Sequence, residues 1–350
     1  MQITFNDKTA LELLRYARAN NYDLQPGSFE APSPDPHRYW TRRLVEDLDI
    51  FGVTPPYCSM VPSKGSRIAS AAFSNTIYSN LPFGSTIALN DEVSFCCPEL
   101  LFLEMGRGLS IARQALLGYE LCGSYSLGIP TVFGVAPVTD AARLHGYLDR
   151  LDYVRGVKHA RRASRFVLDG AWSPMEAILA LMIILPADMG GYGMKGILLN
   201  ERVEVTKPMA SLVEKTSRVP DITLDGTPVG INYDGEGHFD LDALAEAAAA
   251  CACNPDDVQL KWALENAKRE LRDAYVDDRR RERDLWVQGK TVFTATKEDL
   301  YQHGALDRLM RQVLEAVQRT TGTRCGTQLA ALGDPSLAAR RHRLLMQLLP

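Results

Sequence analysis

The sequence predicts an α/β protein, with a mixed sheet flanked by helices in its C-terminal half and a mixed α/β domain before it. Three features predict this fold: a β-hairpin at residues 219–234, a long amphipathic helix at 255–288, and a compact strand at 291–295. A hairpin followed by a crossover helix and a further strand forms a mixed sheet with helices on both faces. The chain has 46% hydrophobic and 23% charged residues, which is typical of a globular protein.

Residues 1–150 are expected to form the N-terminal domain, whose role the sequence does not reveal. Apolar residues at helical spacing predict a helix over Lys8–Ala19, and another helix is expected over Tyr39–Ile50. The proline-rich segment Gln25–His37 between them predicts a loop. Pro98 suits the first turn of a third helix. Short strands are expected at Ser66–Ala71, Thr86–Asn90 and Thr131–Val135.

Residues 151–320 are expected to form the C-terminal domain, followed by a helical tail at 321–350. Ser173 is a predicted N-cap for a helix that runs through Ile184, and Glu201–Thr206 predicts a strand. Gly289 is expected to end the long helix. Thr296, with Asp299 three residues later, is expected to cap the helix that follows the last strand.

The hairpin is the most informative part of the chain. Asp221 opens its first strand, and residues 225–228 (Asp-Gly-Thr-Pro) suit a tight turn. Alternation along the second strand places Asn232 and Asp234 on one face. Two carboxylates held close together on rigid strands suit a divalent cation. We therefore expect Asp221 and Asp234 to point into one solvent-open pocket.

Composition limits the classes of function. The N-terminal residues include no basic start or long apolar run, so no signal peptide is expected, and the longest apolar run, Ala177–Pro186, is too short to span a bilayer. The seven cysteines show no disulfide framework, which favours a reducing cytoplasm. The net charge of −4 argues against tight, sequence-independent DNA binding, although a local basic patch would still permit contact with DNA.

Five short segments, in this order, resemble the restriction-endonuclease-like PD-(D/E)xK superfamily. The segments are Ser173-Pro174-Met175-Glu176, Leu199-Asn200, Pro220-Asp221, Tyr233-Asp234-Gly235 with His238, and Asp278-x-x-Arg281-x-x-Asp284-Leu285. The resemblance covers about residues 163–319. It is greatest to the branch that contains very short patch repair endonucleases and the nuclease-like domains of abortive-infection antitoxin relatives, which implies a bacterial protein.

The resemblance implies hydrolysis of a DNA phosphodiester by a water that Mg²⁺ or Mn²⁺ activates. Asp221 and Asp234 would be the catalytic metal ligands, because a bound cation acidifies water and neutralises charge on the phosphate. Glu176 would reach the same place through a water. His238 would protonate the leaving oxygen or contact the phosphate.

The chain departs from the family pattern at two positions. Asn232 stands where the pattern has Asp or Glu, and Asp234 stands where many members carry a catalytic lysine. Asn232 offers a carbonyl oxygen and no charge, so we expect weaker metal binding. By the family pattern, Arg281 and Asn232 would contact the nucleic acid.

Structural roles compete with several of these assignments. Glu176 is the last residue of a Ser-x-x-Glu capping box, which explains it without a metal. Asp221 after proline also suits a strand start or a turn. Residues 261–284 carry eight basic and seven acidic residues, a balance that favours a solvated helix with many ion pairs.

Two functions, and a third more remote one, follow from the sequence. The first is a Mg²⁺-dependent DNA endonuclease, weakened by Asn232. The alternative is a non-catalytic nucleic-acid-binding or antitoxin-type regulatory protein with a degenerate nuclease fold. In the third, the N-terminal domain carries the function and the nuclease-like part is a scaffold for oligomerisation.

Overall fold

The computed structural model describes residues 3–27, 52–90, 93–204, 212–213, 215, 217–234 and 241–350. They form an α/β protein with two compact units, Met1–Ala177 and Ile178–Pro350. The division therefore falls at residue 177 and not near residue 150, because helices at 141–164 contact other helices of the N-terminal unit. The predicted helix Tyr39–Ile50 lies outside the described residues.

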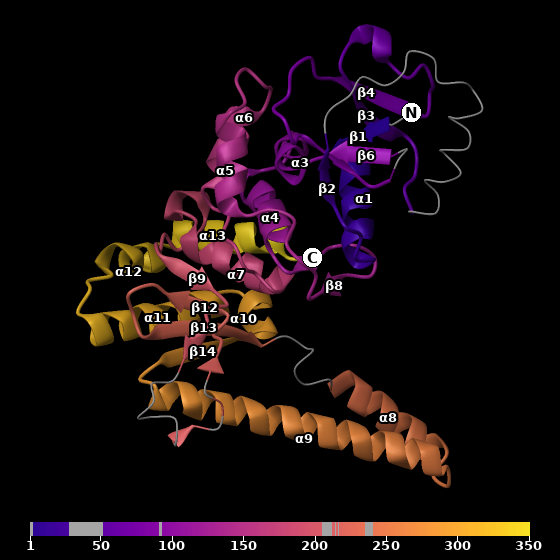
Figure 1. Ribbon diagram of the computed structural model, residues 1–350. Helices are drawn as coiled ribbons and strands as arrows, with labels where there is room; N and C mark the ends of the chain where they lie inside the picture. Colours follow the sequence, from indigo (N-terminus) through magenta and orange to yellow (C-terminus); the bar gives the residue numbers. More distant parts are fainter. Residues whose placement is uncertain are drawn as a thin grey trace. The chain divides into compact units, whose positions relative to one another are not determined.

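The N-terminal unit contains a six-stranded mixed sheet in the order β2-β5-β6-β1-β3-β4. Figure 1 labels β1, β2, β3, β4 and β6 of this sheet. The strands are β1 (Ile3–Phe5), β2 (Gln25–Gly27), β3 (Tyr57–Val61), β4 (Phe73–Ile77), β5 (Thr86–Ala88) and β6 (Val93–Cys96). The central strand β1 runs parallel to β6, with Phe5 beside Phe95, and antiparallel to β3. Both phenylalanines are fully buried, so the centre of the sheet lies within the core.

The described residues of this unit include helices that pack together and a short two-stranded β-ribbon. The helices are α1 (Asp7–Ala19), α3 (Pro98–Met105), α4 (Ile111–Cys122), α5 (Ala141–Asp149) and α6 (Val157–Ser164), and the ribbon pairs β7 (Tyr125–Ser126) with β8 (Val132–Phe133). Helix α1 contacts β3, β6 and α3, whereas α5 and α6 pack against α3 and α4. The 3-10 helix η1 (Lys64–Ser66) follows β3.

Most predicted elements of this unit are present, with two corrections. Helix α1 and the start of α3 at Pro98 are confirmed. Residues 25–27 form strand β2 and not a loop, since Pro26 lies on an edge strand, where a missing N–H is tolerated. Ser66–Ala71 is not a strand, and the strand that follows is β4, which starts at Phe73.

The C-terminal unit contains a four-stranded mixed sheet in the order β14-β13-β12-β9. Its strands are β9 (Ile197–Leu199), β12 (Ile222–Leu224), β13 (Val229–Asp234) and β14 (Thr291–Thr296). The predicted hairpin is confirmed: β12 and β13 are antiparallel, and Gly226 in the turn has a φ of 70° that favours glycine. Strand β14 runs parallel to β13 over residues 229–234 and 291–296.

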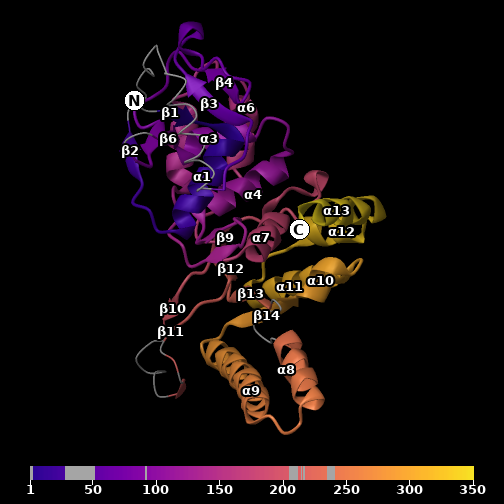
Figure 2. The same ribbon diagram turned by 90° about the vertical axis from the view of Figure 1, so that its right-hand side faces the viewer.

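Residues 201–204 of the strand predicted at Glu201–Thr206 are described, and they do not belong to this sheet. Val203–Glu204 form β10, which pairs with β11 (Ser217–Arg218) in a separate two-stranded sheet (Figure 2). The first strand of the four-stranded sheet is instead β9, which pairs with β12 and buries Ile197.

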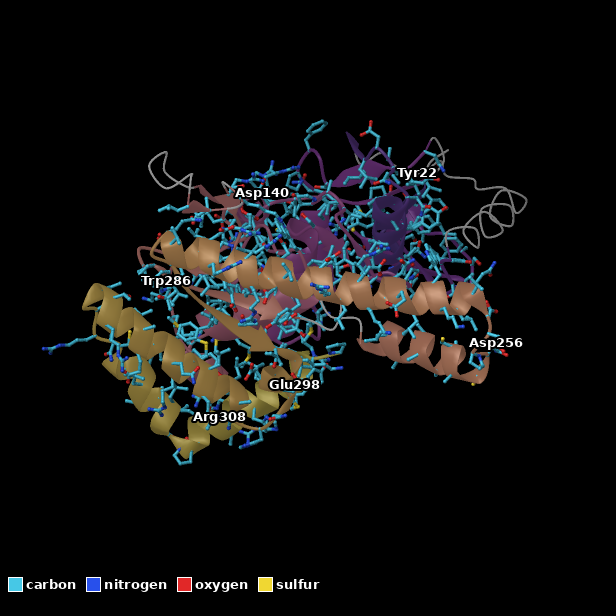
Figure 3. All side chains as sticks on the ribbon, turned by 90° about the horizontal axis from the view of Figure 1, so that it is seen from below. Tyr22, Asp140, Asp256, Trp286, Glu298 and Arg308 are labelled. Atoms are coloured by element: carbon cyan, nitrogen blue, oxygen red, sulfur yellow. The ribbon has the colours of Figure 1, made fainter. Side chains whose placement is uncertain are left out.

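Helices connect and cover the strands of the C-terminal unit. They are α7 (Pro174–Ile184), which begins in the N-terminal unit, η2 (Ala187–Met189), α8 (Leu241–Cys253), α9 (Val258–Val287), α10 (Lys297–Tyr301), α11 (Ala305–Thr321), α12 (Gly326–Gly333) and α13 (Pro335–Leu348). In the sequence, α8 and α9 follow β13 and precede β14. The two helices pack side by side, with Asp256 at the turn between them and Trp286 at the far end of α9 (Figure 3). Helix α11 contacts β13 and β14.

The predicted helical tail is confirmed as α12 and α13, and the capping of α10 is also as predicted. The backbone N–H of Thr296 donates to the carboxylate of Asp299 over 2.9 Å. In the described part of the chain, no helix has the length and apolar composition needed to cross a membrane.

Candidate functional site

The hairpin holds two of the predicted site residues against each other. Asp221 lies directly before β12, and its backbone N–H donates to Oδ1 of Asn232 on β13 over 3.2 Å. In return, the backbone N–H of Tyr233 donates to Oδ2 of Asp221 over 2.6 Å. The side chains of Asp221 and Asn232 thus each accept a hydrogen bond from the backbone of the opposite strand.

Arg281 of α9 completes this group, which we call the Asp221 cluster (Asp221, Asn232 and Arg281). Its Nη2 lies 3.3 Å from Oδ1 of Asp221 and 3.2 Å from Oδ1 of Asn232, and it also donates to the carbonyl of Val219. A guanidinium is always charged and directs several N–H donors at oxygen acceptors. Arg281 therefore supplies positive charge to Asp221, an expected metal ligand, and to the side-chain oxygen of Asn232.

Among the described residues, the carboxylate of Asp221, which we expected to point into a solvent-open pocket, is largely shielded from solvent. The Asp221 side chain is 12% exposed, that of Arg281 is 22% exposed, and Asn232 is buried. The physical reason is that Arg281 reaches from α9 across the carboxylate. An exposed ion pair contributes little to stability, whereas the charge-assisted hydrogen bonds of a shielded pair fix the positions of its side chains.

A second ion pair, one helical turn along α9, ties the same helix to β11. The guanidinium of Arg218 lies 2.7 Å from Oδ2 of Asp284, and both residues are buried. Asp277 lies 3.7 Å from Arg218 and 3.1 Å from the ammonium group of Lys215, and these contacts lower the pKa of Asp277, with Lys215 as the largest cause. Residues 281 and 284 share one face of the helix, so this face docks onto the strands.

Asp234 occupies the end of β13, beside Thr296 of β14, and it is half-buried. It lies two residues beyond Asn232 on the strand. Among the described residues, no group of three or more His, Cys, Asp or Glu side chains is placed to hold a metal ion. His238, the predicted proton donor or phosphate contact, lies outside the described residues.

Glu176 belongs to the N-terminal unit, where it caps the start of α7. Its backbone N–H donates to Oγ of Ser173 over 3.2 Å, and its carboxylate accepts from the backbone N–H of Trp172 over 2.9 Å. The first contact is that of the predicted capping box, whereas the second reaches the residue before the N-cap; both give Glu176 a structural role.

The pairing of Arg218 with Asp284 was not predicted, because the two residues are 66 positions apart and no local pattern links them. Asp284 belongs to one of the five segments that carry the family resemblance, and this membership is the one sequence feature that draws attention to it. Comparison of the chain with family models, curated proteins and solved structures finds no match. The geometry of the site is therefore the basis for assigning its function.

Proposed function

We propose that the C-terminal unit is a non-catalytic, nuclease-like domain and that the protein is a nucleic-acid-binding regulator. The observation that carries this proposal is Arg281, whose Nη2 contacts Oδ1 of both Asp221 and Asn232. A guanidinium in this position neutralises Asp221 and competes with a divalent cation for the same oxygens. The amide of Asn232 adds no charge that would favour the metal.

The nucleic-acid part of the proposal has its support in α9. Three arginines of this helix are exposed and lie within two residues of Arg281 in the sequence: Arg279, Arg280 and Arg283. The guanidinium of Arg279 forms ion pairs with the carboxylates of Asp278 and Glu282, at 3.2 and 2.7 Å. Because these pairs are exposed, they are weak and leave the arginine able to contact phosphates.

A plasmid assay tests the proposal. We expect the protein to leave supercoiled plasmid intact in Mg²⁺ and in Mn²⁺, while it binds duplex DNA with an affinity that falls as salt rises. Fluorescence anisotropy with a labelled duplex measures the binding. Arg279→Ala, Arg280→Ala and Arg283→Ala combined should weaken it, whereas Arg308→Ala on α11 is a matched control with an exposed arginine.

The second candidate, a Mg²⁺-dependent endonuclease, is favoured by Asp234, which shares a strand face with Asn232. It predicts metal-dependent nicking that Asp221→Ala abolishes, and that outcome would replace our proposal. The double substitution Arg281→Ala with Asn232→Asp separates the two further. It removes the competing cation and restores a charged ligand, so the appearance of nicking only in this variant would show a site that has lost its metal.

A further inference from the structure

The N-terminal unit contains a large cleft that the proposed function leaves unused. Its volume is about 920 Å³, within the range of small-molecule sites, and its lining comes from α1, α3, α5 and the segments beside them. We call it the Glu99 cleft after the buried acid in its wall. Its lining includes Tyr22, Phe83, Glu99, Arg143 and Arg150.

The wall of the cleft presents a buried acceptor. Glu99 is 5% exposed and lies in the first turn of α3. Its Oε1 accepts from Oγ1 of Thr139 over 2.5 Å, and Nε of Arg143 lies 3.9 Å away. A carboxylate offers about four lone-pair sites, so it can also accept from the amino group of a ligand.

The rim presents aromatic rings that solvent can reach. Phe83 is 82% exposed and Tyr22 is 43% exposed. Aromatic side chains are common in the lining of small-molecule sites. Stacking on such rings suits any nucleobase, since every base has a π-face.

Two arginines supply positive charge to the cleft. Arg143 is 64% exposed, and the guanidinium of Arg150 lies 5.4 Å from the centre of the Tyr147 ring. Arg150 also lines a second cavity of about 690 Å³ together with Arg107 and Arg155, so positive charge continues beyond the cleft. Arg18 contributes a further charge, but its guanidinium is committed to backbone carbonyls, including that of Gly123.

Among the described residues that line the two cavities, the acids are few. Asp23 and Glu99 line the cleft, and Asp152 lines the second cavity. Across both cavities, arginines outnumber acids, although the whole chain carries a net charge of −4. This local excess favours an anion.

We infer that the Glu99 cleft binds a nucleotide. The base would stack on Phe83 and Tyr22 and donate from an amino group to Glu99, while the phosphate would meet Arg143 and Arg150. A free nucleoside monophosphate and the terminal nucleotide of a single strand share this chemistry. The inference concerns residues of the N-terminal unit alone and does not depend on the proposed function.

Isothermal titration of the full chain tests the inference with two probes, AMP and a 5′-phosphorylated tetranucleotide. Arg143→Ala with Arg150→Ala should weaken binding about tenfold or more, because two charge-assisted contacts are lost. Phe83→Ala should weaken it about fivefold or more through lost stacking. Arg162→Ala on α6, an exposed arginine of the same unit, is the matched control and should bind as the parent protein does.

The outcomes separate the two sources of the ligand. Binding of AMP alone would assign a free nucleotide, and binding of the tetranucleotide alone would assign a strand end. No heat with either probe would overturn the inference. So would unchanged affinity in the double arginine variant, or competition by inorganic phosphate as strong as that by AMP, because the base would then contribute nothing.

Discussion

In each unit of the protein an acid lies beside an arginine, and the two pairs differ in how far the arginine side chain is exposed to solvent. In the C-terminal unit, Arg281 lies 3.3 Å from Asp221 and shares its Nη2 among three acceptors. In the N-terminal unit, Arg143 lies 3.9 Å from Glu99, and its side chain is 64% exposed. Arg281 thus contacts three acceptors of the protein itself, whereas most of the Arg143 side chain is open to solvent and to the ligand that we infer.

This difference shows why residue type alone does not identify a site. Asp221 lies in a segment that resembles a family motif for metal chemistry, yet its oxygens accept from the Tyr233 N–H and from Arg281. Glu99 matches no motif, yet it lines a cleft of about 920 Å³ with arginines and aromatic rings beside it. The number of partners that a charged group already has decides whether it can bind anything else.

The largest effect is expected from Asp284→Ala. It should lower the free energy of unfolding by about 3–5 kcal/mol, because Arg218 is left charged and buried. Urea denaturation measures this loss. Asp277→Ala is the control: that carboxylate is about half exposed, so its loss should cost about 0–1 kcal/mol. Equal effects of the two substitutions would mean that α9 is not held through Asp284.

An intermediate effect is expected from Arg281→Ala. Removing the guanidinium leaves the oxygens of Asp221 and Asn232 without their charged donor, which should cost about 1–3 kcal/mol of unfolding free energy. Arg143→Ala in the other unit should stay within about 0.5 kcal/mol, as for most surface substitutions. If both variants lose the same stability, the contrast between Arg281, which contacts three acceptors, and the exposed Arg143 is wrong.

The smallest effect concerns pH and Glu104 in the N-terminal unit. Burial raises the pKa of Glu104, although donors such as Tyr78 and Asn6 oppose this. Because the folded-state pKa lies above the unfolded value, its contribution to stability is full below about pH 4.5, the usual value for glutamate, and is lost as pH rises through the folded-state pKa.

The measurement is the unfolding free energy of the parent and of Glu104→Gln from pH 4 to pH 8. The stability of the parent relative to the variant should fall as pH rises, since glutamine does not ionise. A constant difference across this range would show that the pKa of Glu104 is not shifted by folding.

The local features of the chain were predictable from sequence. The hairpin at 219–234, the start of α3 at Pro98 and the capping of α10 all appear as expected. Each depends on residues within a few positions of one another, so short-range sterics and hydrogen bonding are sufficient to specify it. Strand β2 was missed because only its place at the sheet edge makes Pro26 acceptable there.

The sequence by itself determined where the strands and helices of the hairpin region lie and which acids its strands carry. Only the tertiary structure decided that Arg281, 60 positions from Asp221, would meet that carboxylate, and that residues as distant as 22 and 147 would line one cleft. Contacts of this kind depend on how whole elements pack. Packing is set by the summed burial of many side chains, which no local pattern records.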